Sequence, residues 1–205
     1  MRHNVFLLTL SCSAVLLLLA ALLLWAGTRY NLNPWHNVGD VIDEYKQVPI
    51  YFNGGIKHTQ GRQRASDGYN FGLKYQCVEF VKRFYYTQYQ HRMPDTFGNA
   101  HDFFQAQLKS GEYNRQRNMY QFRNDGQFAI QTDDLIVFRP WLLNPFGHVA
   151  IVSEVTAQDI EIVQQNPGLF ASSRERIRLS LTESNKLADT NVLGWLRLPS
   201  NMKKP

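Results

Sequence analysis

The sequence predicts an α+β fold in which helices come first and an antiparallel sheet follows, preceded by an apolar N-terminal segment. Three observations predict it. An uncharged run of 22 residues, Val5–Ala26, opens the chain. Apolar residues then follow helical spacing from residue 78 to about 90, and apolar, strand-like runs occupy 134–140, 148–155 and 159–166. Helical patterns followed by strands with short connections are typical of the α+β class.

The length and charge of the chain indicate one membrane or targeting element and one folded domain of ordinary size. The expected segments are 1–27 as a membrane anchor or signal sequence, 28–40 as a linker, 41–199 as the folded domain and 200–205 as a tail. The net charge is +5 and the basic residues are scattered, which suits an anionic surface or substrate. No groove-reading motif accompanies this charge, so nucleic acid is not an expected partner.

The N-terminal run is long enough for one transmembrane helix, since spanning the hydrocarbon layer takes roughly 20 apolar residues. Secretory signal cores are shorter, about 7–15 residues, and end at a small-x-small site. Leu24 or Trp25 occupies the position where that site needs a small residue. We therefore expect an uncleaved single-pass anchor, with a cleaved signal as the alternative. Arg2 before the run and Arg29 after it give the orientation, and we expect the domain outside a bacterial inner membrane.

The first half of the domain is predicted to contain one short strand and two helices. A strand at 48–55 ends in Asn-Gly-Gly, and a loop rich in Gly, Asp and Asn leads to Cys77. The helix from Val78 to about Gln90 carries a wide apolar arc, which places it largely inside the domain. A second helix is expected at 99–111, ending at a glycine.

The second half is predicted to form the sheet. Runs 148–155 and 159–166 are joined by three residues, short enough for an antiparallel hairpin, and 191–199 supplies a final strand. Alternation along a strand places His148 on the same face as Ala150 and Val152, with Val149 and Ile151 on the other. The hairpin brings 164–166 back toward His148.

The chain has only two cysteines, Cys12 in the apolar run and Cys77 in the domain. This excludes a disulfide framework and argues against a zinc site. Cys77 is therefore either a buried structural cysteine or a nucleophile. A position at the start of a helix favours a lowered pKa and the reactive thiolate.

A nucleophilic cysteine needs a base within hydrogen-bond reach and a group that orients the base. His148 begins an apolar strand, whereas the other histidines lie in polar loops, at helix starts or at the terminus. An amide oxygen from 164–166 could accept one imidazole proton and leave the other nitrogen facing the thiol. The ordinary alternatives are a structural histidine and a polar cap at a strand end.

Three blocks of sequence carry a family resemblance: "GLKYQCVEFVKRF", "FGHVAIVSEV" and "IEIVQQN". They resemble the CHAP amidase family of papain-like cysteine amidohydrolases and peptidases. Within that family the likeness is greatest to the amidase domain of glutathionylspermidine synthetase/amidase. The likeness extends through "GDVIDEYKQVPIYFNGG", "DDLIVF" and "LGWLRL", and so covers roughly residues 38–198.

The resemblance implies a papain-like (CHAP, NlpC/P60-like) fold with Cys77 as nucleophile and His148 as base. The family commonly orients the histidine with the glutamate of a Glu-Gln-Asn run, and here Gln164 stands at that position. A neutral amide can still fix the imidazole tautomer, but it stabilises imidazolium less, so reduced or retuned activity is expected. Asn166 retains the family residue.

The expected activity is hydrolysis of an amide bond by acyl transfer, with no metal or organic cofactor. The backbone N–H of Cys77 and the Gln76 side chain would stabilise the oxyanion, with Asn166 in support. Lys82 and Arg83 are candidate substrate contacts, with a solvated helix face as the alternative. The substrate is expected to be a glutathionylspermidine-like amide or a peptide bond of peptidoglycan. A hypothesis from another class is a catalytically weak module that binds the cell wall.

Overall fold

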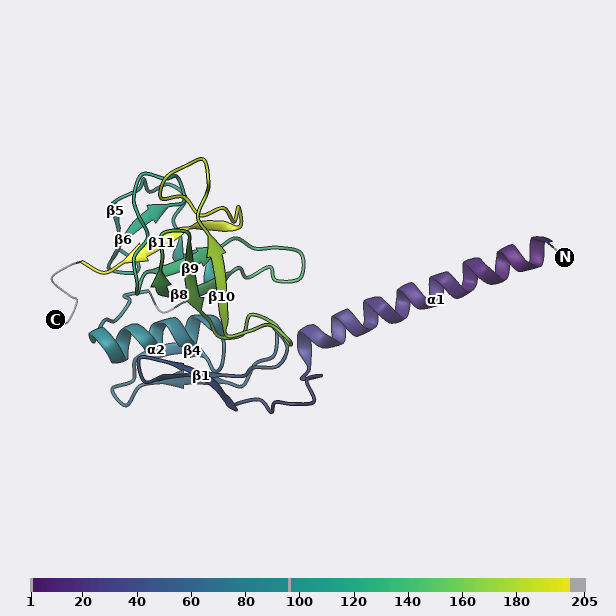
Figure 1. Ribbon diagram of the computed structural model, residues 1–205. Coiled ribbons are helices and arrows are strands. Elements are labelled where there is room, and N and C mark those ends of the chain that lie inside the picture. Colours follow the sequence, from purple (N-terminus) through teal and green to yellow (C-terminus); the bar gives the residue numbers. More distant parts are fainter. Residues whose placement is uncertain (1, 96, 200–205) are drawn as a thin grey trace.

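The computed structural model describes residues 2–95 and 97–199, with side chains from residue 13 onward, and the predicted tail at 200–205 lies outside this range. The described chain is α+β, as predicted, and mostly sheet (Figure 1). Its elements, in chain order, are α1 (Arg2–Arg29), β1 (Val41–Tyr45), β2 (Val48–Tyr51), β3 (Arg62–Arg64), β4 (Asn70–Leu73), α2 (Cys77–Tyr89), a 3₁₀ helix η1 (Ala100–Phe103), β5 (Glu112–Asn114), β6 (Met119–Arg123), β7 (Leu135–Phe138), β8 (His148–Val155), β9 (Asp159–Val163), β10 (Arg174–Arg178) and β11 (Val192–Arg197).

The main sheet has seven strands in the order β10-β9-β8-β7-β11-β6-β5, with every neighbouring pair antiparallel. Two small antiparallel pairs, β1-β2 and β3-β4, lie on the opposite side of α2 from this sheet (Figure 1). The predicted hairpin is present as β8 and β9. Strands β5, β6 and β10 were not predicted: β5 has only three residues, and β10 carries charged residues in place of most apolar ones.

Helix α2 supplies the core beneath the candidate site. Phe80, Val81 and Phe84 are fully buried and pack in one cluster with Val149 and Ile151 of β8. The alternate residues of β8, Ala150 and Val152, belong to a second cluster on the far face of the sheet, around Trp195. The predicted alternation of β8 and the predicted burial of α2 are both confirmed. Packing of α2 on β8 sets the helix start beside the first residues of that strand.

The second predicted helix, at 99–111, is wrong. Only one 3₁₀ turn, Ala100–Phe103, forms there, closed by a reciprocal capping box between Asn99 and Asp102. The chain then leaves helical geometry, because side chains of β6 bind the backbone groups that a helix would pair internally. Gln121 hydrogen bonds both the N–H and the carbonyl of Gln105, and Arg123 donates to the Ala106 and Leu108 carbonyls.

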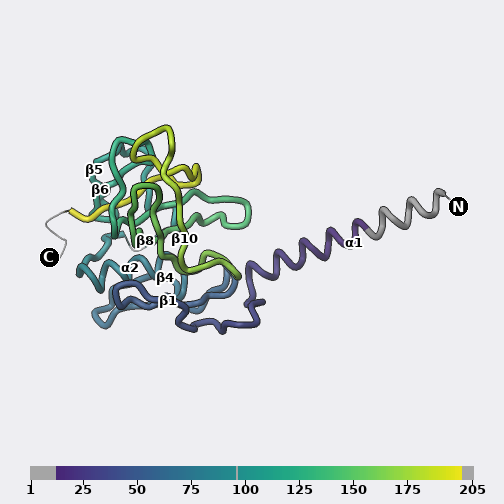
Figure 2. Tube along the Cα trace, viewed as in Figure 1, coloured from purple at the N-terminus to yellow at the C-terminus, as the bar shows by residue number. Residues whose placement is uncertain are grey.

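Helix α1 leads away from the domain, and its C-terminal end lies beside the domain's loops (Figure 2). Within the residues that the structure describes, no helix combines the length and apolar character that crossing a membrane requires. The predicted span Val5–Ala26 begins in residues whose side chains, up to residue 12, lie outside that description. The predicted transmembrane helix is therefore unsupported by the described part of the chain.

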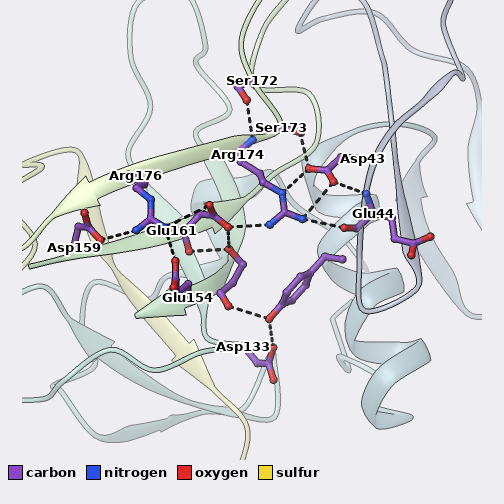
Figure 3. Close-up of polar contacts among 12 residues, drawn as sticks. Asp43, Glu44, Asp133, Glu154, Asp159, Glu161, Ser172, Ser173, Arg174 and Arg176 are labelled. Atoms are coloured by element: carbon purple, nitrogen blue, oxygen red, sulfur yellow. Dashed lines mark hydrogen bonds and ion pairs between the residues drawn. The ribbon is translucent and has the colours of Figure 1, made fainter. Parts of the chain in front are cut away.

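The β1-β2 hairpin is fastened to the main sheet by Arg174 of β10 (Figure 3). Its guanidinium donates to Asp43 of β1 at 2.8 Å and to Glu161 of β9 at 2.9 Å. The Tyr45 hydroxyl adds a 2.9 Å hydrogen bond to Asp133, in the turn before β7. These contacts hold the hairpin, and with it the start of the loop that follows β2, against the sheet.

Candidate active site

Cys77 is the first residue of α2 and is 8% exposed at the wall of a cavity of about 630 Å³. The preceding residue, Gln76, is the N-cap, and its side chain makes no capping hydrogen bond. The first N–H groups of an α-helix have no partner inside the helix, so those of α2 remain available to the cavity. The backbone N–H groups of Val149, Val78 and Cys77 lie near enough to the sulfur to lower the pKa of the thiol. The thiol thus lies beside the start of β8, the strand whose first residue is His148.

Burial controls the protonation of Cys77. It raises the pKa of the thiol to about 11, although the N–H groups of Val149 and of the first turn of α2 act in the opposite direction. The expectation that the helix start lowers this pKa is therefore wrong. Removing the sulfur from water disfavours thiolate by more than the helix dipole and the three N–H groups stabilise it. At neutral pH the resting group is the thiol.

We therefore expect the alkylation of Cys77 by iodoacetamide to accelerate about tenfold for each pH unit between pH 7 and 10, without levelling off. The sign follows from the raised pKa, because the thiolate fraction keeps growing until the pH approaches 11. Mass spectrometry of the Cys77 peptide gives the rate. 2-Mercaptoethanol, an ordinary small thiol, is the reference. A rate already constant below pH 7 would instead indicate a preformed thiolate–imidazolium pair.

His148 is oriented by Gln164, as the hairpin predicts. The imidazole Nε2 lies 2.9 Å from the Gln164 Oε1. The amide nitrogen of Gln164 donates to the Ser172 carbonyl at 3.1 Å and to Glu175 at 3.4 Å, which fixes the amide with its oxygen toward the ring. Nε2 must then carry the proton, and Nδ1 is left as an acceptor. Burial lowers the pKa of His148 to about 4, with the Gln164 hydrogen bond partly opposing, so the imidazole is neutral at pH 7.

The turn before β8 delivers His148 to its position. Gly147 has a φ of +71°, and a Cβ there would lie 2.7 Å from the Phe138 carbonyl oxygen, so a side chain is excluded. Asn144 closes the turn by donating to the Gly147 carbonyl at 2.9 Å. Asn144 lines the Cys77 cavity and also a second cavity of about 690 Å³ that contains His148. Cys77 and His148 therefore line two cavities that share Asn144 in their walls.

Gln76 and Asn166 hold a loop next to the cysteine. The Gln76 amide nitrogen donates to the carbonyls of Ile56 (3.3 Å) and His58 (2.7 Å). Asn166 donates to the Gln76 Oε1 at 2.7 Å and to the Ile56 carbonyl at 3.1 Å. Both N–H groups of the Gln76 amide are thus engaged, which argues against the predicted role as an oxyanion donor. Asn166 lines the Cys77 cavity, but its side chain hydrogen bonds Gln76 and the Ile56 carbonyl. Of Gln164 and Asn166, only Gln164 hydrogen bonds His148.

Lys82 and Arg83, the candidate substrate contacts, lie away from both cavities. Lys82 is 1% exposed, donates to the Asn70 carbonyl and lies over the Tyr69 ring, and burial lowers its pKa to about 8. Arg83 pairs with Glu79 one turn earlier on α2. Lys82 therefore neither lies on a solvated helix face nor contacts either cavity. Both side chains hold α2 against its neighbours.

Gln165 and Glu79 connect the two halves of the site, a role of Gln165 that was not predicted from the sequence. The Gln165 side chain is fully buried and donates to the Gln76 carbonyl at 3.0 Å and to Glu79 at 2.8 Å. Its oxygen accepts the N–H of Tyr51 in β2 at 2.8 Å. The end of β9 is thereby tied to the start of α2. The signal in the sequence that could have indicated this role is the position of Gln165 between Gln164 and Asn166, which both had candidate roles.

Among the described residues, no group of three or more His, Cys, Asp or Glu side chains is placed to bind a metal ion. What the arrangement offers is a buried thiol beside uncapped helical N–H groups, and a neutral imidazole with a fixed tautomer. This set is suited to nucleophilic attack on a carbonyl.

Comparison with known proteins finds the CHAP domain over residues 67–166, which confirms the resemblance predicted from the sequence. Two curated proteins of Crithidia fasciculata are similar. One, named trypanothione synthetase, is 28% identical over 169 residues, and the other, named glutathionylspermidine synthase, is 29% identical over 147 residues. The matches cover 77% and 61% of this chain, but only 26% and 19% of those proteins. A solved structure entitled "The crystal structure of Ly7917" matches 62% of this chain and 54% of its own, with 16% identity and a TM-score of 0.41.

Proposed function

We propose that this chain, whose residues 67–166 match the CHAP domain, is a cysteine amidohydrolase with Cys77 as nucleophile and His148 as general base. The observation that carries the proposal is the hydrogen bond between the His148 Nε2 and Gln164, because it fixes the tautomer that leaves Nδ1 as a proton acceptor. The thiol lies against the N–H of Val149, the residue that follows this histidine.

The reaction follows from the protonation states. As the sulfur attacks the carbonyl carbon, the Nδ1 of His148 takes the thiol proton, so a neutral pair passes directly to the tetrahedral intermediate. The uncapped N–H groups of Cys77 and Val78 are the available donors for the oxyanion. His148 then gives the proton to the leaving amine and later activates the water that releases the acyl group from sulfur.

The substrate we favour is a glutathionylspermidine-like amide, because one of the two relatives is named a glutathionylspermidine synthase. The second candidate is a peptide bond of peptidoglycan, and the apolar N-terminal run favours it. We retain the single-pass inner-membrane location, with the domain outside, as a proposal that rests on this run alone. Fractionating cells that express the full chain tests the location, and its recovery free of membranes would contradict it.

Incubation of the full chain with glutathionylspermidine and, separately, with purified peptidoglycan tests the activity. We expect products of amide cleavage from one of the two by mass spectrometry. The Cys77→Ala variant is the matched control and is expected to yield none. If neither substrate is cut and Cys77 also resists alkylation at pH 10, the amidohydrolase proposal fails.

The Gln164→Glu substitution is expected to activate the thiol and destabilise the fold. A carboxylate beside Nε2 favours imidazolium, so alkylation of Cys77 at pH 7 should become about tenfold faster. The new carboxylate would face the Ser172 carbonyl and Glu175, both acceptors, which should lower the free energy of unfolding by about 1–3 kcal/mol. Alkylation rates and urea denaturation measure the two effects. Gln131→Glu, at an exposed position, is the control, and an unchanged alkylation rate would contradict the assigned geometry.

A further inference from the structure

The cavity at Cys77 is lined by three cations and no carboxylate. The basic residues are Arg29, Lys57 and Arg62, and no Asp or Glu contributes to the wall. None of the three forms an ion pair among the residues that the structure describes. Some arginines elsewhere in the domain are neutralised by neighbours, as Arg174 and Arg176 are by Asp43, Glu154, Asp159 and Glu161 (Figure 3), whereas others, such as Arg178, form no ion pair among the described residues. The positive charge at the cavity is therefore uncompensated.

Three separate segments bring these cations together. Arg29 ends α1, Lys57 lies in the loop after β2, and Arg62 begins β3. The end of α1 is held in place, because the Lys57 N–H donates to the Thr28 carbonyl at 2.7 Å. A Cβ on Gly55 would lie 2.6 Å from the Thr28 backbone, so the loop and the helix end approach as closely as glycine allows.

The same loop is tied to the residue before the nucleophile. The carbonyls of Ile56 and His58 accept the Gln76 amide, so Lys57 is flanked on both sides by anchored residues. Arg62 pairs with Leu73 of β4, and Leu73 and Gly72 both line the cavity. The positions of the cations relative to Cys77 are thus set by backbone contacts.

The cavity of His148 differs in charge. Glu175 and Asp189 line it together with Arg139 and Arg174, so both signs are present. His148 protonates the leaving amine in the proposed mechanism, and the amine therefore departs on that side. The acyl part of the substrate lies on the side of Cys77, where only positive charge is found.

We propose that Arg29, Lys57 and Arg62 form an anion-binding subsite that selects amides whose acyl part carries a carboxylate, and that the end of α1 completes it. This inference rests on the proposed function, because it assigns the acyl side from the roles of Cys77 and His148. Phe97 and Phe146, 71% and 40% exposed, give the same cavity apolar surface for the rest of an acyl chain. Uncompensated charges in a cleft raise the local concentration of an oppositely charged reactant.

A pair of alkylating reagents measures the electrostatic effect of these three cations at the Cys77 sulfur. Iodoacetate and iodoacetamide react with a thiol by the same step: sulfur forms a bond to carbon, iodide leaves and the thiol proton is lost. Only iodoacetate is an anion. The ratio of their rates on Cys77, followed by mass spectrometry of the full chain, cancels any change in thiolate fraction. At low ionic strength we expect it to exceed the ratio for 2-mercaptoethanol by about tenfold, and to fall toward that reference in 0.5 M salt, where charges are screened over about 4 Å.

Single substitutions assign the effect to residues. Arg29→Gln, Lys57→Gln and Arg62→Gln should each lower the ratio by about two- to fivefold. Arg178→Gln, which removes an exposed arginine of β10 outside the cavity, is the matched control and should leave it unchanged. If only Arg29→Gln has no effect, the part assigned to α1 is overturned.

Two further outcomes distinguish failure of the subsite proposal from failure of the proposed hydrolysis. A ratio equal to that of 2-mercaptoethanol, and unchanged in the three variants, overturns the subsite while the reactive thiol and the proposed hydrolysis stand. A Cys77 that reacts with neither reagent at pH 10 overturns the proposed function, and the subsite with it. Peptide amides that differ only by Glu or Gln on the acyl side provide a second readout. The Glu amide should have the lower KM, and Arg62→Gln should weaken that preference.

Discussion

Replacement of Cys77 by serine is expected to lower the rate of amide hydrolysis at least about a thousandfold at pH 7. A serine hydroxyl ionises far less readily than a thiol, and a neutral amide-oriented imidazole is a weak base for removing its proton. The sulfur lies in a buried position among N–H groups, and oxygen is only slightly smaller, so the fold should be retained. Product formation measured by mass spectrometry gives the rate, and thermal unfolding verifies the fold.

The variant Cys12→Ser removes the chain's other cysteine and is the matched control, with unchanged activity expected. A covalent acyl adduct on Cys77, trapped by acid during turnover, would provide direct support. Full activity in Cys77→Ser would overturn the nucleophile assignment. If no hydrolysis is detected and the cellular role of the protein survives Cys77→Ala, the binding-module hypothesis stands instead.

The substitution His148→Gln is expected to reduce hydrolysis by about 10²–10⁴-fold at pH 7. The pKa of Cys77 near 11 means that almost no thiolate exists without a base, so attack then depends on the small ionised fraction. Activity in the variant should consequently rise about tenfold per pH unit up to pH 10. In the natural protein the rate should vary little between about pH 6 and 8, because His148, with a pKa of about 4, is already neutral.

His36→Gln, in an exposed loop away from both cavities, is the control for loss of a histidine and should behave as the natural protein does. The pH profile separates a base from a structural residue. A structural histidine would lower the rate by the same factor at every pH, and a parallel profile would therefore contradict the role assigned to His148.

The local elements of the fold were predictable from short-range patterns. The apolar arc after Cys77 marked α2 to within one residue at each end, and β8 was predicted at its observed bounds. Both depend on periodicity along a single segment. The helix expected at 99–111 failed because Gln121 and Arg123, from a strand later in the chain, bind its backbone groups.

The sequence by itself determined which residues could perform the chemistry: the domain's one cysteine at a helix start, a histidine at the head of an apolar strand, and an amide at the end of the next strand. Tertiary structure decided the rest. Burial leaves both Cys77 and His148 neutral. Gln164, and not Asn166, hydrogen bonds the imidazole, while Gln76 binds the loop at 56–58. Three distant segments place their cations in the wall of the Cys77 cavity. The physical reason is that protonation and partner choice depend on burial and on contacts between distant segments, which periodicity within one segment does not report.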